Sequence, residues 1–469
     1  MAGNRLTIRA SLEIAYLERE LQYLFDLTTS AHWGGLAVGV VRVERELARR
    51  ARRHLGDSLA FCVYDRFSNR ILTIDDDIAA DVLDGRLQID FTPAPSPYRL
   101  QLRRLALANA TIYHAAQFLL GRSFTREEIL RIREKELAAL DRASSGTALD
   151  NPRSISRVPH RDASLDPATL VISGGLDWEF KNLRALQSLK QSYGFRYCTI
   201  VHDIIPILFP HLVIPDRVAA LTNYFGELAH LADCALCNSQ ATRRDWLAYC
   251  AQLGIDMPAH VFPLGFDLPI SKDTPEEKFP ELLRGKRFAL FVSTFEPRKN
   301  HRMLYEAWDR CVRSKAVDPE RDRLVFVGNH GWATDDLMRE IAANPATRDS
   351  LLVLHLVPDA LLHVLYQRCE LVLFPSLYEG YGLPVAEAFG HGKPCISSNA
   401  GSLLDVGGDL VRRLDPKDTI AWAEAIAHYL AAPDELDAWR KRIATEYCPT
   451  SWDDAATRFF GTIEDVAVS

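Results

Sequence analysis

Short apolar, β-branched runs recur along the chain, separated by stretches with the three-to-four-residue spacing of amphipathic helices. This alternation predicts βα units with parallel sheets whose faces are both covered by helices. The runs form two groups. The first lies at 23–28, 59–64, 169–173, 196–201 and 234–238, and the second at 288–293, 324–328, 351–356, 371–375 and 394–398. We therefore predict an α/β protein with two parallel-sheet domains.

The length of 469 residues exceeds what a single core usually supports. We place an N-terminal Rossmann-like domain at 1–265 and a C-terminal one at 275–445, because Pro, Gly and charged residues cluster near 261–279. The segment 446–469 contains an amphipathic helix, which we expect to pack back toward the N-terminal domain.

An insertion at about 76–165 interrupts the N-terminal domain. Residues 98–140 have the period of one or two amphipathic helices with i,i+4 charge pairs. Residues 141–165 are rich in Ser, Arg and Asp and predict a long loop.

Composition excludes several classes of protein. The net charge of −7 argues against a protein that coats nucleic acid. No apolar run is long enough to span a bilayer and no signal-like segment follows Met1, so we expect a cytoplasmic protein. Cys234 and Cys237 form a lone C-x-x-C in a strand-like run, and because residues three apart face opposite sides of a strand, buried free thiols are expected.

The densest chemistry lies in LVLFPSLYEGYGLPVAEAFGHGKP, residues 371–394. An apolar strand is followed by Gly380 and Gly382, which allow close approach of a ligand, and by Pro384 at the first position of a helix. The amides that end this loop then face outward with the positive end of the helix dipole behind them, which suits a diphosphate. The amides concerned belong to Tyr381, Gly382 and Leu383.

Two carboxylates flank this loop. Glu379 precedes it at the edge of the sheet, and because phosphate would repel it, it needs another partner. Glu387, one helical turn on, is placed to accept hydrogen bonds from ribose hydroxyls; the alternative is that it only interacts with the helix dipole.

A second loop follows the strand 288–293 and carries two cations, Arg298 and Lys299, before a helix that Asn300 is predicted to cap. At the carboxyl edge of a parallel sheet these cations could neutralise a diphosphate leaving group. A solvated Arg-Lys pair is the alternative in isolation, but both loops occur in the same half.

These motifs resemble the retaining glycosyltransferases of family 4, which have the GT-B fold of two Rossmann-like domains facing each other across a cleft. Glu379 and Glu387 match the family's E-x7-E pattern. The resemblance covers most of the chain outside 76–165. It includes EPRKNH, VGNHGW, NAGSLLDVGGD and, in the first half, GVVRVERELARR, VHDIIPILFP and VFPLGFD.

The resemblance implies a role for each matching residue. Glu379 would contact the hydroxyls of the donor sugar and Glu387 the ribose. Arg298, Lys299 and the amides of Gly380, Tyr381, Gly382 and Leu383 would bind the diphosphate. Gly39 and Arg42 would approach it from across the cleft, His202 and Asp203 would line the acceptor side, and Thr294 and Gly328 join the nucleotide-binding set. Ser293 and Asp405 depart from the family pattern near the nucleotide.

The implied reaction is transfer of a hexose, with retention, from a nucleoside-diphosphate sugar, GDP-mannose by the resemblance. The acceptor would be a growing saccharide or a polyprenyl-diphosphate-linked one in surface polysaccharide biosynthesis. No cofactor and no metal are expected, because cations and the helix dipole neutralise the phosphates; a metal-dependent alternative would use Asp75, Asp76 and Asp77. The same fold would also fit a sugar-nucleotide epimerase, a phosphorylase, for which no pyridoxal lysine is evident, or a non-catalytic nucleotide-sugar scaffold.

The helix that begins near Val40 is rich in arginine. A basic face of this kind could rest on anionic lipid at the inner membrane, or it could be a solvated face balanced by Glu44 and Glu46; the sequence supports both equally. The cations are Arg42, Arg45, Arg49, Arg50, Arg52 and Arg53, with a second cluster at Arg103 and Arg104.

Overall fold

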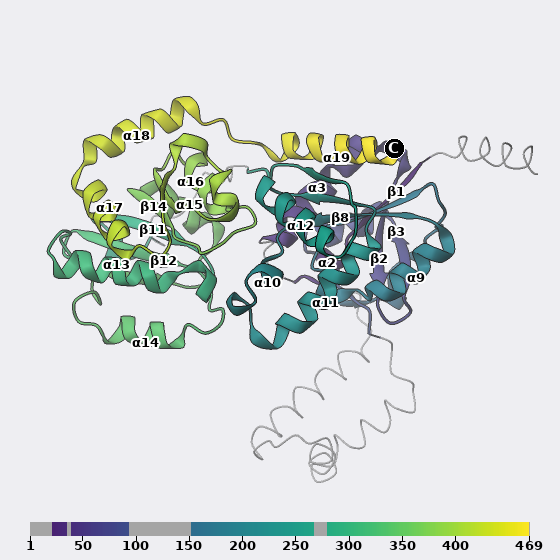
Figure 1. The fold of residues 1–469 in the computed structure, drawn as a ribbon, viewed down its shortest axis with the longest axis horizontal. Coiled ribbons are helices and arrows are strands. Elements are labelled where there is room, and N and C mark those ends of the chain that lie inside the picture. Colours follow the sequence, from purple (N-terminus) through teal and green to yellow (C-terminus); the bar gives the residue numbers. More distant parts are fainter. Residues whose placement is uncertain (1–20, 35–38, 93–151, 267–278, 469) are drawn as a thin grey trace, which may run out of the picture.

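The computed structural model describes residues 21–34, 39–92, 152–266 and 279–468. Within these ranges the chain forms two α/β halves, each built around its own sheet and lying side by side (Figure 1). Every strand predicted from the apolar runs is present, with its ends within two residues of the predicted ones. The two Rossmann-like halves of the predicted fold are therefore confirmed.

The N-terminal sheet has the strand order β10-β9-β8-β7-β1-β2-β3-β6, parallel except at β3 and β6. The order reverses between β1 and β7, and at such a switch point the carboxyl ends of the strands leave a crevice. The strands are β1 (Gln22–Asp26), β2 (Leu59–Asp65), β3 (Arg70–Ile74), β6 (His160–Asp162), β7 (Thr169–Ser173), β8 (Arg196–Val201), β9 (Cys234–Cys237) and β10 (Ala259–Val261).

Helices cover both faces of this sheet. One core lies beneath α3, α4 and α19, and the other beneath α9, α11 and α12. Cys234 belongs to the first core and Cys237 to the second, so the two thiols face opposite sides of β9 and are free, as predicted. The helices are α2 (Thr28–His32), α3 (Val40–Leu55), α4 (Asp76–Leu83), α8 (Asp177–Phe180), α9 (Leu183–Tyr193), α10 (Ile205–Leu208), α11 (Pro215–Leu231) and α12 (Gln240–Gln252).

The predicted boundaries of the insertion, about 76–165, are too wide. At its start α4 packs against α2 and α3, and near its end β6 pairs with β3, so both segments belong to the domain. Between them β4 (Ile89–Asp90) pairs with β5 (Arg153–Ser154), which gives part of the predicted loop regular structure. The helices predicted at 98–140 lie outside the described residues.

The acidic run at 75–77 begins α4. Asp75 stands at the N-cap position, all three carboxylates are exposed, and Asp76 pairs with Arg52 at 2.6 Å. Carboxylates in a first helical turn interact favourably with the helix dipole. Among the described residues, no group of three or more His, Cys, Asp and Glu side chains could hold a metal ion.

The C-terminal sheet is fully parallel, with the order β13-β12-β11-β14-β15-β16. Numbered from β11, this is the 3-2-1-4-5-6 order of dinucleotide-binding folds, and its switch point lies between β11 and β14. The strands are β11 (Arg287–Val292), β12 (Asp322–Val327), β13 (Leu351–Leu354), β14 (Leu371–Phe374), β15 (Cys395–Ser398) and β16 (Arg412–Leu414). The helices are α13 (His301–Arg313), α14 (Asp335–Ala343), α15 (Asp359–Arg368), α16 (Leu383–Gly390), α17 (Thr419–Ala431) and α18 (Pro433–Glu446).

After α18 the chain crosses back to the N-terminal half, where the last helix, α19 (Trp452–Val468), packs on α3 (Figure 1). Trp452, Phe459 and Phe460 are buried in the N-terminal core, and Asp453 pairs with Arg50 at 2.5 Å. No helix in the described ranges combines the length and hydropathy needed to cross a membrane.

Candidate active site

Two loops meet at the switch point of the C-terminal sheet. One follows β11 and carries Arg298 and Lys299 in a single 3-10 turn; the other follows β14 and carries Glu379. Because β11 and β14 are parallel neighbours, their carboxyl ends bring together side chains that are 80 residues apart in the sequence.

Glu379 forms ion pairs with both cations. Its Oε2 lies 2.9 Å from Nη1 of Arg298, and its Oε1 lies 2.6 Å from Nζ of Lys299. Burial, which leaves the residue 7% exposed, would by itself raise the pKa of Glu379, but the two cations outweigh burial and lower that pKa to about 2. The carboxylate is therefore ionised at neutral pH, and these cations are the partner that the sequence required for it.

Arg298 is held from three sides. Its guanidinium also donates to Glu296 at 2.6 Å and to the carbonyl oxygen of Tyr378 at 2.9 Å. These contacts fix the planar fork, and the charge of Glu379 raises the pKa of Arg298 even though burial opposes it. Arg298 thus orients Glu379 from behind, whereas Lys299 faces the cleft.

The glycine loop turns the chain from β14 into α16. Gly382, at the N-cap, has a φ of 103°, and a Cβ there would come within 2.5 Å of Leu403. The amides of Gly380, Tyr381 and Gly382 have no hydrogen-bond acceptor within the described residues. With the helix dipole behind them, these amides form a surface suited to an anion.

Gly380 is also a contact point between the two halves. A Cβ at this position would lie 2.1 Å from the carbonyl oxygen of His202 and 2.8 Å from Cβ of Asp203. The Gly380 carbonyl accepts hydrogen bonds from Ser239 at 2.7 Å and Thr242 at 3.1 Å, both in the N-terminal half. Only glycine permits this approach of the loop to the opposite wall.

Glu387 lies one turn into α16 and is held from both sides of the cleft. The Tyr366 hydroxyl donates to its Oε2 at 3.0 Å, and Nη1 of Arg42 lies 3.5 Å from its Oε1. Burial raises the pKa of Glu387. Arg42, predicted to approach the phosphates, therefore contacts Glu387, and Tyr366 is a partner that the sequence did not indicate.

The N-terminal wall contributes three further predicted residues besides Arg42. Gly39, with a φ of 52°, starts α3 and has open space where a Cβ would stand. Nε2 of His202 lies 2.8 Å from the carbonyl oxygen of Gly174, and because burial lowers the pKa of His202, the ring is neutral and Nε2 is the donor. Asp203 accepts the amide of Ile205 at 3.0 Å.

These groups line one cleft of about 880 Å³ between the halves, a volume typical of small-molecule sites. Three predicted residues do not reach it: Arg298, Thr294 and Gly328. The predicted residues that line it are Gly39, Arg42, His202, Asp203, Lys299, Glu379, Gly380, Tyr381, Gly382, Leu383 and Glu387.

Residues 273–445, which include most of the predicted residues that line the cleft, match the family described as "Glycosyl transferases group 1". O-antigen chain mannosyltransferase B of Escherichia coli is 30% identical over 276 residues, which are 56% of this chain and 68% of that protein. The chain belongs to the group 1 glycosyltransferases. The serotype-specific mannosyltransferase WbdA of Escherichia coli is 30% identical over 216 residues, but the matched part is only 26% of its length.

Solved structures show the fold of this glycosyltransferase over almost its whole length. Anabaena Alr3699/HepE, crystallised with UDP and glucose, superposes with a TM-score of 0.56 at 15% identity, covering 95% of this chain and 100% of that one. Sucrose-phosphate synthase from Thermosynechococcus elongatus gives a TM-score of 0.55 at 16% identity, with 96% and 100% covered. The predicted GT-B fold is thereby confirmed.

The residues that the resemblance places near the nucleotide differ in their positions and contacts. Thr294 is exposed, and a Cβ at Gly328 would lie 1.8 Å from the carbonyl oxygen of Ser293, so this glycine allows two loops to pack. Asp405 accepts the amide of Ala241 at 3.2 Å and so ties the C-terminal half to the start of α12. Ser293 itself lines the cleft.

Asn300 stands at the predicted N-cap position of α13, but its side chain makes no capping hydrogen bond. Asn300 has a φ of 65°, and its amide group donates instead to the carbonyl oxygens of Pro375 at 3.1 Å and Pro416 at 2.7 Å. Asparagine tolerates this left-handed conformation, and its side chain joins the loop after β11 to the loop after β14.

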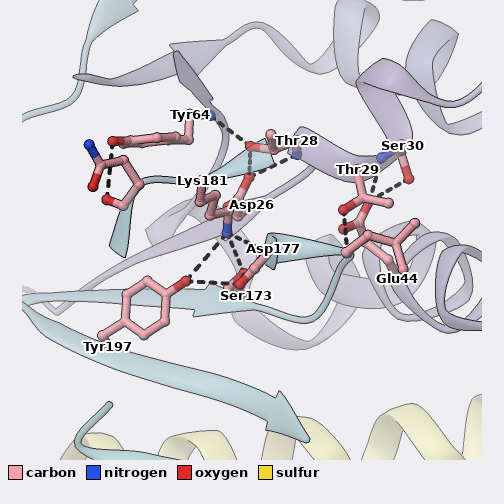
Figure 2. A network of polar contacts seen from close by, with 12 residues as sticks. Asp26, Thr28, Thr29, Ser30, Glu44, Tyr64, Ser173, Asp177, Lys181 and Tyr197 are labelled. Carbon is pink, nitrogen blue, oxygen red and sulfur yellow. Dashed lines mark hydrogen bonds and ion pairs between the residues drawn. The ribbon is translucent and has the colours of Figure 1, made fainter. Parts of the chain in front are cut away.

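A second polar cluster, which the sequence did not lead us to predict, fills the switch point of the N-terminal sheet (Figure 2). Nζ of Lys181 pairs with Asp26, lies 2.8 Å from Oδ1 of Asp177 and donates to Ser173 at 2.5 Å. The Tyr197 hydroxyl donates to Asp177 at 3.2 Å. The Lys181 side chain is only 1% exposed, so this cluster is internal.

One feature of the sequence could have indicated the cluster around Lys181. Asp26 ends the first apolar run, and Asp177 follows the third, so both occupy the strand-end position that drew attention to Glu379. The loop after β7, which Lys181 and Asp177 hold, also contains Gly174, whose carbonyl oxygen bonds His202. The cluster therefore supports the N-terminal wall of the cleft.

Glu44 lies beside this cluster and forms no ion pair with any cation in the described part of the chain (Figure 2). Its Oε1 accepts the amide of Ser30 at 2.8 Å and the Ser30 hydroxyl at 2.5 Å. Burial raises the pKa of Glu44 to about 8, and these hydrogen bonds offset burial only in part. The carboxyl group is therefore mostly protonated at neutral pH.

The arginines of α3 mostly bond within the protein. Of the two glutamates predicted to balance them, Glu46 does so, whereas Glu44 is buried and accepts hydrogen bonds from Ser30 instead. Arg49 and Arg50 pair with Glu46, Arg52 with Asp76, and Arg53 with Asp453. Arg42 pairs with Glu387, as described above, and Arg103 and Arg104 lie outside the described residues.

Proposed function

We propose that this chain transfers a hexose, with retention, from a nucleoside-diphosphate sugar to a growing saccharide or lipid-linked acceptor in surface polysaccharide biosynthesis, with GDP-mannose as the favoured donor. The observation that carries the proposal is Glu379, held by two cations in the interdomain cleft beside a loop whose amides have no acceptor among the described residues. The mannosyltransferases among the relatives favour mannose as the sugar.

In this proposal each cleft residue has one role toward the donor. The ionised Glu379 accepts hydrogen bonds from hydroxyls of the sugar, and Lys299 with the amides of the glycine loop binds the diphosphate. Glu387 accepts hydrogen bonds from the ribose, which requires Arg42 to leave it; the freed guanidinium then turns to the phosphates. Arg298 is a positioning residue.

The chemical step follows a front-face route. The bond between the anomeric carbon and the β-phosphate oxygen breaks while the acceptor oxygen bonds to the same face of that carbon, so the configuration is retained. The leaving phosphate oxygen takes the acceptor's proton, and the products are the glycoside and the nucleoside diphosphate. Lys299 and the amides stabilise the charge that develops on the leaving group, and His202 and Asp203 line the acceptor side. The proposal requires neither a metal nor another cofactor.

The test measures release of nucleoside diphosphate from GDP-mannose, UDP-glucose, dTDP-glucose and ADP-glucose, with and without a mannose oligosaccharide, in magnesium and in EDTA. We expect GDP release only from GDP-mannose with acceptor present, the same in both buffers, and NMR of the product should show the retained anomer. An inverted product would disprove retention. Dependence on magnesium would disprove the metal-free step.

Binding is tested separately by thermal unfolding. A nucleotide at 100 times its dissociation constant adds roughly 2.7 kcal/mol to the free energy of unfolding. If no nucleotide or nucleotide sugar raises the unfolding temperature, the cleft does not bind the donor and the proposed transferase function fails. Binding without release of nucleoside diphosphate would favour the non-catalytic nucleotide-sugar scaffold. Glu379→Gln is the matched control, which should bind GDP and fail in transfer.

A further inference from the structure

The cleft continues beyond the donor residues along α3. Arg42, Arg45 and Arg49 lie on successive turns of this helix and all line the cleft, as do Asp84 and Gly85 at the end of α4. Only N-terminal residues form this part, whereas the groups assigned to the donor come mainly from the C-terminal half. We call the part lined by Arg45, Arg49, Leu83, Asp84 and Gly85 the α3 lobe.

Among the residues that the structure describes, Arg45 differs from its neighbours in forming no ion pair. Arg49 donates to Glu46 at 3.0 Å and to the carbonyl oxygen of Leu83 at 2.8 Å, and Arg42 pairs with Glu387. Within the described ranges Arg45 makes a single hydrogen bond, from Nη2 to the carbonyl oxygen of Trp33 at 3.2 Å, and no ion pair.

The guanidinium of Arg45 is nevertheless buried. The residue is 5% exposed, and its Nε lacks an acceptor among the described residues. Arginine stays charged in proteins, and buried charges are normally paired because desolvation without a partner is unfavourable. Nη1 stands beside Gly85, where an added Cβ would be 3.6 Å away, so position 85 places no side chain against this edge of the guanidinium.

We propose that Arg45 anchors an acceptor subsite in the α3 lobe that takes an oxyanion, a phosphate or carboxylate group carried by the acceptor saccharide. The inference rests on the proposed function, because it concerns the acceptor of that reaction and adds that this acceptor carries a negative charge. An anion in the lobe supplies the counter-ion that the fold leaves out, and the planar fork of Arg45 suits a bidentate contact. The donor diphosphate is assigned elsewhere, to Lys299 and the glycine loop on the opposite wall.

The experiment uses the full-length protein and two matched pairs of probes: mannose 6-phosphate with mannose, and glucuronate with glucose. Calorimetry or ligand-observed NMR should show that the wild type binds at least one charged sugar about tenfold or more tighter than its neutral partner. The pair that shows the preference identifies phosphate or carboxylate as the group.

Arg45→Gln should abolish this preference while GDP affinity stays within twofold of wild type. Arg45→Lys, which retains the charge but not the fork, should keep part of the preference. Arg52→Gln is the control, because Arg52 lies on the same helix but pairs with exposed Asp76 outside the lobe. If Arg45→Gln does not fold, the Arg45→Lys variant and the paired probes on the wild type still decide the question.

Equal binding of charged and neutral sugars by the wild type would overturn the proposal. A parallel loss of mannose 6-phosphate and GDP binding in Arg45→Gln would assign Arg45 to the donor phosphates instead. If the wild type prefers the charged sugar but binds no nucleotide, the subsite stands and the proposed transferase function fails.

Discussion

Both sheets of this glycosyltransferase have a lysine and carboxylates at the switch point, yet the two clusters have different surroundings. In the N-terminal half Lys181 is enclosed by Asp26 and Asp177, whose side chains are 6% and 3% exposed. In the C-terminal half the side chains of Glu379 and Lys299 are 10% and 16% exposed and line the cleft. The same residue types therefore build an internal support in one half and a binding surface in the other.

The difference shows that position in the topology does not by itself define a ligand site. A crevice at the switch point is available in both sheets, but the N-terminal one is filled by the side chain of Lys181 from the loop after β7. In the C-terminal half Lys299 and Glu379 instead line the cleft between the halves. Four measurements test whether the two clusters differ in this way.

The largest expected effect is on stability, from Lys181→Met. Removing the cation leaves Asp26 and Asp177 buried together without a counter-ion, and breaking a buried pair in this way costs about 3–5 kcal/mol. Urea unfolding gives the value. Arg70→Ala, which breaks the exposed pair with Asp162, should cost less than about 1 kcal/mol. If the two variants are equally stable, Lys181 is not a structural support.

Next in size is the effect of Lys299→Ala on turnover. In the C-terminal cluster the same loss of a lysine should leave the fold intact but remove charge stabilisation from the leaving group, which lowers the rate about 10²–10³-fold. Rates with GDP-mannose and GDP affinity are compared with those of Lys417→Ala, an exposed lysine outside the cleft. Normal turnover together with lost stability would make the two clusters alike.

The third test uses pH, because the pKa values of Glu44 and Glu379 are shifted in opposite directions. The pKa of Glu44 is raised from 4.5 to about 8, so between these values the folded state holds a proton that the unfolded state has released. Glu44 therefore makes the free energy of unfolding fall as pH rises from about 4.5 to 8, by up to roughly 1.4 kcal/mol per pH unit. Glu44→Gln should remove this slope in urea unfolding measured across the range.

Glu379 supplies the opposite control. Its pKa is lowered from 4.5 to about 2, so the stability it contributes is complete above about pH 4.5 and is lost as pH falls toward 2. Glu379→Gln should thus change no slope between pH 5 and 8. If the free energy of unfolding depends on pH in the same way in the wild type and in Glu44→Gln, Glu44 is ionised in the folded protein.

The smallest effect is expected from Tyr366→Phe. This change removes the hydrogen bond from the Tyr366 hydroxyl to Glu387 and should weaken nucleotide binding by about two- to tenfold, because a single hydrogen bond contributes about 0.5–1.5 kcal/mol. Tyr305→Phe is the control, since Tyr305 bonds Asn344 outside the cleft. Equal affinities for GDP in both variants would remove Tyr366 from the site.

Much of the fold could be predicted because the order of apolar and polar residues indicates which positions are buried. Strands such as β11 and β14 are almost continuously apolar, and their spacing is that of βα units. The borders of the predicted insertion were wrong because β6 is short and exposed, with the polar sequence His-Arg-Asp. Its place in the sheet comes from pairing with β3, which leaves no periodic signal.

The sequence alone determined the two halves, the glycine loop and the strand-end position of Glu379, because periodicity and local turn chemistry are properties of short segments. Tertiary structure alone decided the partners: Lys299 for Glu379, Tyr366 and Arg42 for Glu387, and Lys181 for Asp26. It also left Arg45 without a counter-ion among the residues that the structure describes. These pairings join residues far apart in the chain, and which charges become paired, buried or open to a cleft depends on how the elements pack.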